Sequence, residues 1–111
     1  MRRREFLGGF ELLVLSAVMR VGPEAYGVPI ADAIAETSGR DVALGSVYVT
    51  LDRLARRGLV TTRLGEPTAE RGGRAKTYFR VTAKGVLEVR QARQTLVGLW
   101  HKIPQLTGGT A

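Results

Sequence analysis

Basic side chains gather in one part of this sequence, and the chemistry they offer is the binding of anions. Between Arg53 and Lys84 there are nine basic residues and two acidic ones, a local net charge of +7, whereas residues 1–45 carry a net charge of −1. Arginine presents a planar fork of donors that fits phosphate oxygens and the edge of guanine. The whole chain of 111 residues has the same net charge of +7. This segment therefore accounts for the entire surplus and predicts an anionic partner.

Groups that would support covalent, metal or cofactor chemistry do not form a constellation. The sequence has no cysteine, and the single histidine, His101, has no Asp or Glu at ligand spacing. Gly72-Gly73 is not followed by the Lys-Ser or Lys-Thr pair of a nucleotide-phosphate loop, and there is no nucleophile with a base beside it. We expect neither an enzyme, nor a metal site, nor a cofactor.

The elements that position the basic residues are three helices followed by a hairpin. Apolar spacing and helix breakers predict helices over about 10–21, 26–38 and 46–57, which end at Gly22-Pro23, Gly39 and Gly58, with Ser46 as the N-cap of the third. Two segments rich in Val and Thr flank a glycine-containing loop and predict a β-hairpin over about 59–82. A final helix over about 83–103 and a frayed tail, 104–111, complete the chain. The predicted class is mainly α with a small β-hairpin, α+β.

This order is that of a winged helix-turn-helix domain, which we place at residues 1–82. Its third helix would enter a DNA major groove and its hairpin loop would be the wing. At 100° per residue Val47, Leu51 and Leu54 face the core, whereas another face carries Ser46, Thr50, Arg53 and Arg57, with Val49 and Arg56 at its edges. The basic segment covers the second half of this helix and the wing. The predicted partner is therefore double-stranded DNA.

Five short segments follow one another at characteristic spacings. They are LGGFELLVL at 7–15, EAYG at 24–27, LGSVYVTLDRL at 44–54, GLV at 58–60 and ERGGRAKTYF at 70–79. Together they resemble the PadR family of bacterial transcriptional regulators. The resemblance implies a dimeric DNA-binding repressor, often responsive to a small molecule, whose C-terminal helix carries the dimer contact.

Recognition helices read bases mainly with their N-terminal part, so we expect the first residues of the third helix near bases and its arginines on phosphates. The alternative for these arginines is a solvated helix face. Tyr48 lies one step off the core face and either packs half-buried or, as the resemblance implies, reaches a phosphate. The wing tip either approaches the DNA backbone or is only a solubilising turn. The predicted DNA-binding residues are Ser46, Tyr48, Val49, Thr50, Arg53, Arg56, Arg57, Arg71, Gly72, Gly73, Arg74 and Lys76.

The last helix carries an apolar seam with spacings of 3, 4, 3 and 4, and a lone domain of this size has little left to cover it. A second copy of the chain would bury the seam, or it could fold back on residues 6–13 of its own chain. Both can hold, since the resemblance places the first and last helices together at the dimer interface. The expected interface residues are Phe6, Phe10, Val89, Ala92, Leu96, Leu99, Trp100 and Ile103.

Trp100 lies beside this seam and has two interpretations. As an aromatic residue on an apolar helix face it packs in the interface. In one branch of the family that the chain resembles, an aromatic near this place lines a hydrophobic drug-binding cleft between subunits. That branch implies a hydrophobic or aromatic effector molecule.

Arg3-Arg4 imitates a twin-arginine export signal, but Glu11 interrupts the approach to the apolar run and no cleavage site follows Arg20. No segment approaches the roughly 18 apolar residues of a membrane span. We therefore predict a cytoplasmic, ligand-responsive repressor that binds a near-palindromic operator as a homodimer. The rival interpretation is a basic protein that binds nucleic acid without sequence preference.

Overall fold

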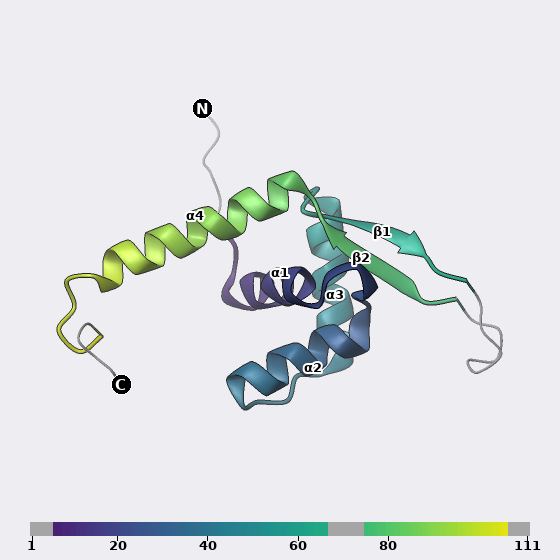
Figure 1. Cartoon of the computed structure of the whole chain (residues 1–111), viewed down its shortest axis with the longest axis horizontal. Coiled ribbons are helices and arrows are strands. Elements are labelled where there is room, and N and C mark those ends of the chain that lie inside the picture. Colours follow the sequence, from purple (N-terminus) through teal and green to yellow (C-terminus); the bar gives the residue numbers. More distant parts are fainter. Residues whose placement is uncertain (1–5, 67–74, 107–111) are drawn as a thin grey trace.

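The computed structural model describes residues 6–66 and 75–106 and has the predicted order of elements. Helices α1 (Gly9–Val21), α2 (Gly27–Ser38) and α3 (Leu44–Arg56) are followed by strands β1 (Val60–Leu64) and β2 (Thr77–Val81) and by helix α4 (Ala83–Trp100). A short 3-10 turn, η1 (Gly22–Glu24), connects α1 to α2. In Figure 1 the hairpin and α4 leave the three-helix body in opposite directions. The expected α+β fold is confirmed.

The core lies between the three helices and the root of the hairpin. Helix α1 packs against both α2 and α3, and the hairpin closes one side. Each predicted core position on α2 and α3 is buried. The buried side chains include Val14, Leu15 and Val18 of α1, Ile30 and Ile34 of α2, Val47, Leu51 and Leu54 of α3, and Leu59, Val60 and Phe79 of the hairpin region.

The hairpin is antiparallel and is attached to the helices by its second strand. Its register pairs Val60 with Val81 and Leu64 with Thr77. The Phe79 N–H donates to the carbonyl oxygen of Ala25 at 2.8 Å, so the connection between α1 and α2 lies along the outer edge of β2. The predicted wing-tip residues Arg71, Gly72, Gly73 and Arg74 lie outside the described residues.

Glycines end the first three helices as the sequence predicts. Gly22, Gly39 and Gly58 have φ values of 86°, 75° and 76°, in the left-handed region that favours glycine. Each of them leaves the helical path directly at or after the last helical turn. The reversals that bring α2, α3 and β1 back across α1 therefore depend on these positions.

Two predicted helix boundaries are wrong. Helix α3 starts at Leu44, and its N-cap is Ala43 and not Ser46, because nothing in the preceding residues prevents the helix from extending backward. Helix α2 agrees with the predicted range to within one residue and has Tyr26 as its extended N-cap. Helix α4 ends at Trp100 and gives way to turns before Ile103. The residue before a proline is disfavoured in helical conformation, so Pro104 ends the helix earlier than the apolar seam suggests.

Candidate nucleic-acid interface

An exposed line of side chains runs along the outer side of α3. Its members are spaced by 3, 4 and 3 residues, which places them on one helix face. We call it the α3 stripe, and it consists of Ser46, Val49, Arg53 and Arg56. The side chain of Arg53 is 55% exposed and that of Arg56 is 78% exposed, although Arg56 pairs with Asp52 at 2.7 Å. The stripe thus combines a small and an apolar residue at the N-terminal half with two cations at the C-terminal half.

Thr50 does not belong to this outward face, contrary to the expectation from the helical wheel. It is only 4% exposed. On the wheel Thr50 lies 60° from Val47, which puts it at the border of the core face, and the surrounding structure covers it there. The outward face is therefore rotated away from Thr50 and toward Val49 and Arg56.

Tyr48 packs across the start of α2. A β-carbon at Gly27 would collide with the Cζ and hydroxyl oxygen of Tyr48, so only glycine leaves room for the ring. The rest of the side chain stays accessible, with Tyr48 42% exposed. The packing interpretation of Tyr48 therefore describes its ring, while contact of its hydroxyl with a phosphate stays a prediction.

Arg57 and Arg53 meet a carboxylate of α1 that sequence reasoning did not assign to the site. Arg57 Nη1 donates to Glu11 Oε1 at 3.2 Å, and Arg53 Nη1 lies 3.7 Å from Glu11 Oε2. Arg57 and Glu11 are 46 residues apart in the chain. The sequence signal for this pairing was an acidic residue in the first turn of the mainly apolar α1.

The C-terminal end of α3 is closed by residues at the start of α4. Lys84 Nζ donates to the carbonyl oxygen of Arg57 at 3.2 Å, and the Thr82 hydroxyl donates to the carbonyl oxygen of Gly58 at 2.8 Å. The same hydroxyl accepts the Gly85 N–H at 3.0 Å. A cation near the last carbonyls of a helix also interacts favourably with the helix dipole. Lys84 therefore has a structural partner.

Two tyrosines and two cations join the loop end of the hairpin strands, the root of the wing, to the start of α2. The Tyr26 and Tyr78 rings meet edge to face with centroids 5.8 Å apart. Arg63 Cζ lies 4.6 Å from the Tyr78 ring centroid, and Lys76 Nζ lies 4.3 Å from that of Tyr26. Such cation–π contacts contribute about 0.5–1 kcal/mol at exposed sites. Lys76, a predicted DNA contact, thus lies at the base of the wing beside α2.

The predicted dimer residues divide between the core and the surface. Phe10 and Val89 pack against the core of their own chain, and Ala92, Leu96 and Ile103 are partly exposed. Phe6, Leu99 and Trp100 are exposed. Helix α4 packs against α1, so the interpretation that the seam folds back on its own chain holds for its first part. The part of α4 beyond Ala92 presents apolar side chains to the surface.

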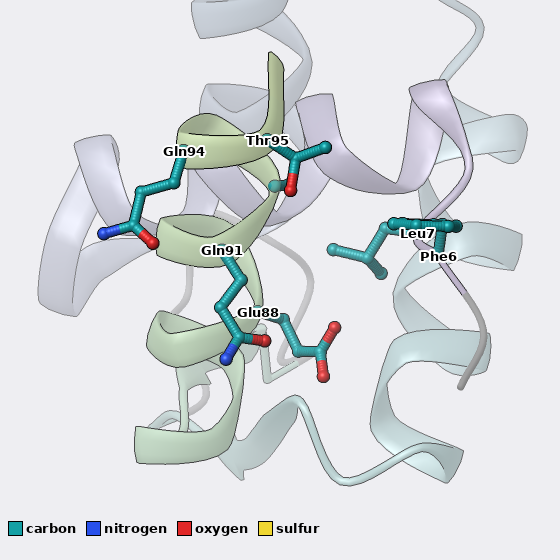
Figure 2. Close-up of a pocket in the computed structure, with 7 residues that line it drawn as sticks. Phe6, Leu7, Glu88, Gln91, Gln94 and Thr95 are labelled. Atoms are coloured by element: carbon teal, nitrogen blue, oxygen red, sulfur yellow. The ribbon is translucent and has the colours of Figure 1, made fainter. Parts of the chain in front are cut away.

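A pocket of about 340 Å³ lies between the N-terminal segment and α4. In Figure 2, Phe6 and Leu7 lie across from α4, whose Glu88 and Thr95 side chains extend toward them while Gln94 extends to the other side. The lining residues are Phe6, Leu7, Glu88, Gln91, Ala92, Gln94 and Thr95. Trp100, the residue predicted to contact an effector, is not among them.

The part of the chain that the structure describes offers no cluster of three His, Cys, Asp or Glu side chains that could hold a metal ion. Within residues 6–66 and 75–106, no helix has the length and apolar character needed to cross a membrane.

Comparison with known proteins gives one family and a set of similar folds. The family model described as the transcriptional regulator PadR-like family matches residues 14–91, which is 78 of the 111 residues. No functionally curated protein gives a significant match.

Three solved structures illustrate the likeness in fold. A PadR-like transcriptional regulator from Bacillus cereus is 21% identical and has a TM-score of 0.70, over 91% of this chain and 93% of that chain. A PadR family transcription regulator from Clostridium difficile is 20% identical with a TM-score of 0.70, over 91% and 100%. The RosR protein of H. salinarum is 21% identical with a TM-score of 0.66, over 89% and 82%. At these identities the likeness establishes a shared fold.

Proposed function

The chain belongs to the PadR-like family of transcriptional regulators, and from that premise we propose that it is a sequence-specific, ligand-responsive repressor that binds a near-palindromic operator as a homodimer. Members of this family are transcriptional regulators, which bind DNA and are not enzymes. The observation that carries the finer proposal is the α3 stripe. It is exposed on the helix that a winged helix-turn-helix places in the major groove.

In this proposal the N-terminal residues of the α3 stripe contact bases, and its C-terminal residues contact the DNA backbone. Ser46 and Val49 lie in the N-terminal half of α3, the part that contacts base edges in helix-turn-helix proteins. Val49 suits the methyl group of thymine, and Ser46 can hydrogen-bond to several base edges. Arg53 and Arg56 follow in the C-terminal half and bind phosphates, which sets the register of the helix on the duplex.

Tyr48 and the wing add contacts beside the helix. The Tyr48 hydroxyl lies at the N-terminal end of α2, where helix N–H groups also favour an anion. Arg71, Gly72, Gly73, Arg74 and Lys76 belong to the wing, which would follow the backbone next to the groove that α3 occupies. The Tyr26–Tyr78 contact supports this placement, since it ties the wing root to the start of α2.

The homodimer is supported by the apolar side chains that α4 leaves uncovered. Leu99 and Trp100 are exposed, with Leu96 partly exposed on the same helix face. A second α4 packed on this face would bury them together with Phe6, Ala92 and Ile103. Two α3 helices held in this way would enter successive major grooves about 34–36 Å apart.

The effector proposal follows from the same geometry. Because α4 would hold the two recognition helices at their spacing, a hydrophobic or aromatic molecule that changes α4 packing would change operator affinity without touching DNA. Trp100 would stack on it or pack in the interface. Since the DNA of a bacterial cell lies in the cytoplasm, we place the protein there.

A competition experiment tests the proposal. We expect footprinting on the DNA around its own gene to reveal a near-palindromic protected site, and an excess of random DNA to displace the protein from it poorly. Salt dependence alone does not discriminate, since specific and non-specific binding both release counterions. If random DNA competes as well as the site itself, the protein is the non-specific nucleic-acid binder of the rival interpretation.

A further inference from the structure

The Glu11 carboxylate of α1 makes polar contacts with the residue that precedes α1 and with the C-terminal end of α3. Its Oε1 atom accepts the Gly8 N–H at 2.9 Å and the Arg57 Nη1–H at 3.2 Å, and its Oε2 atom lies 3.7 Å from Arg53 Nη1. The Glu11 side chain is only 13% exposed. Hydrogen bonds to a charged acceptor in such a place are stronger than those made in water. One carboxylate thus joins the start of α1 to the end of the recognition helix.

The three arginines of α3 differ in how far Glu11 restrains them. Arg57 is held most closely, with a direct hydrogen bond and a side chain that is 30% exposed. Arg53 approaches the same carboxylate at a longer distance and stays more than half exposed. Arg56 points to Asp52 on its own helix and makes no contact with Glu11. The exposed guanidinium groups are therefore those of Arg53 and Arg56.

We propose that Glu11 is a positioning residue that sets how many phosphates α3 neutralises, because it retains Arg57 within the protein and restrains Arg53. This inference rests on the proposed function, in which α3 lies against DNA. An arginine that binds a phosphate must turn its guanidinium outward, and for Arg57 this means leaving a shielded carboxylate that also accepts the Gly8 N–H. Glu11 thereby lowers the sequence-independent part of the affinity for DNA. The contacts of the α3 stripe then contribute a larger share of that affinity.

The salt dependence of binding measures this role directly. Each phosphate that a basic side chain neutralises changes the slope of log K against log salt by about −0.9 on double-stranded DNA. A residue that only stabilised the fold would alter affinity or stability without adding to this slope. The number of phosphates neutralised therefore distinguishes a positioning role from a structural one.

The experiment compares Glu11→Gln with Glu36→Gln in the full-length protein. Glutamine keeps the length of the side chain and an oxygen for the Gly8 N–H, but it removes the charge that holds the arginines. Glu36 is exposed on α2 and forms no ion pair with a described residue, so its variant matches the change in net charge. Fluorescence anisotropy on one DNA duplex at several salt concentrations gives the slope for each variant.

We expect Glu11→Gln to steepen the slope by about 0.9 per subunit, because Arg57 is freed while Arg53 already binds a phosphate in the proposed arrangement. Glu36→Gln should keep the slope of the original protein. Adding Arg57→Gln to Glu11→Gln should remove the part of the increase that Arg57 provides. An equal slope for Glu11→Gln and Glu36→Gln, or a shallower one for Glu11→Gln, overturns the proposal.

Arg57→Gln alone keeps the inference testable if Glu11→Gln does not fold. The sequence predicts Arg57 as a DNA contact, whereas this proposal holds it on Glu11 and away from phosphates. Its removal should therefore leave the slope unchanged, and a loss of about 0.9 per subunit overturns the proposal. The proposed function fails by a separate result. If Arg56→Ala and Val49→Asp leave DNA affinity unchanged, α3 is not the DNA-binding helix, whatever the Glu11 variants do.

Discussion

Replacing Gly85 by alanine tests how α4 is joined to the hairpin. Gly85 is buried in the first turn of α4, and a β-carbon there would collide with the backbone oxygen of Leu59 and lie 2.6 Å from Cγ2 of Val81. Leu59 has little freedom to move, because its side chain is buried and its carbonyl oxygen accepts the Thr82 N–H at 3.0 Å. The added methyl group must therefore push the start of α4 away from Leu59 and β2.

The expected loss follows from two opposing terms. Overpacking of a core site costs about 1–3 kcal/mol, and overlap with backbone atoms favours the upper part of that range. Alanine recovers about 1 kcal/mol over glycine within a helix. We expect Gly85→Ala to lower the free energy of unfolding by about 1–2 kcal/mol, or roughly 4–8 °C in Tm for each kcal/mol.

Gly98 of the same helix provides the matched control. No atom lies within 4 Å of a β-carbon built there, so Gly98→Ala should raise the free energy of unfolding by about 0.4–1 kcal/mol. Gly98 follows Val89 by nine residues, which places it on the opposite side of the helix from Val89 and away from the predicted dimer seam. Urea unfolding followed by circular dichroism, at one protein concentration, compares the two variants. If Gly85→Ala unfolds at the same or higher urea concentration than Gly98→Ala, the described packing of Gly85 against Leu59 and Val81 is wrong.

Three further predictions concern binding and assembly. Leu96→Asp should shift the dimer toward monomer in light scattering because it places an unpaired charge in the seam, whereas Gln94→Asp on the other side of α4 should not; an unchanged mass for Leu96→Asp argues against the seam. Gly27→Ala should displace the Tyr48 ring and weaken operator binding while the far-UV spectrum keeps its helical form, and full affinity would leave Tyr48 only a packing role. Arg53→Ala and Arg56→Ala should each reduce the salt slope of operator binding by about 0.9 per subunit, and an unreduced slope would remove both from the phosphate contacts.

Local signals in the sequence were enough to predict most of the fold. Gly22, Gly39 and Gly58 mark helix ends because a left-handed backbone at those positions favours glycine, and this requirement is visible without knowing any tertiary contact. The spacing of Val47, Leu51 and Leu54 likewise specifies a core face from helix geometry alone. Helix starts were less well predicted, since Ser46 has the right side chain for a cap but α3 begins two residues earlier without one.

The site was less predictable because its geometry depends on residues far apart in the chain. Thr50 and Val49 are neighbours in the chain, and only tertiary packing decides that Thr50 is covered and Val49 is not. The Glu11–Arg57 pair spans 46 residues. No periodicity or spacing in a single sequence specifies which acidic residue an arginine will meet across a core.

These pairings change how the positive charge between Arg53 and Lys84 should be interpreted. If all nine basic residues from Arg53 to Lys84 neutralised phosphates, the salt slope would approach about −8 per subunit. Yet Arg57 binds Glu11, Lys84 binds a backbone carbonyl, and Arg63 and Lys76 lie on tyrosine rings. Part of the surplus thus stabilises the recognition helix and the wing root. The charge count of this segment is therefore an upper limit on its phosphate contacts, and in the proposed arrangement Arg53 and Arg56 of the α3 stripe make such contacts.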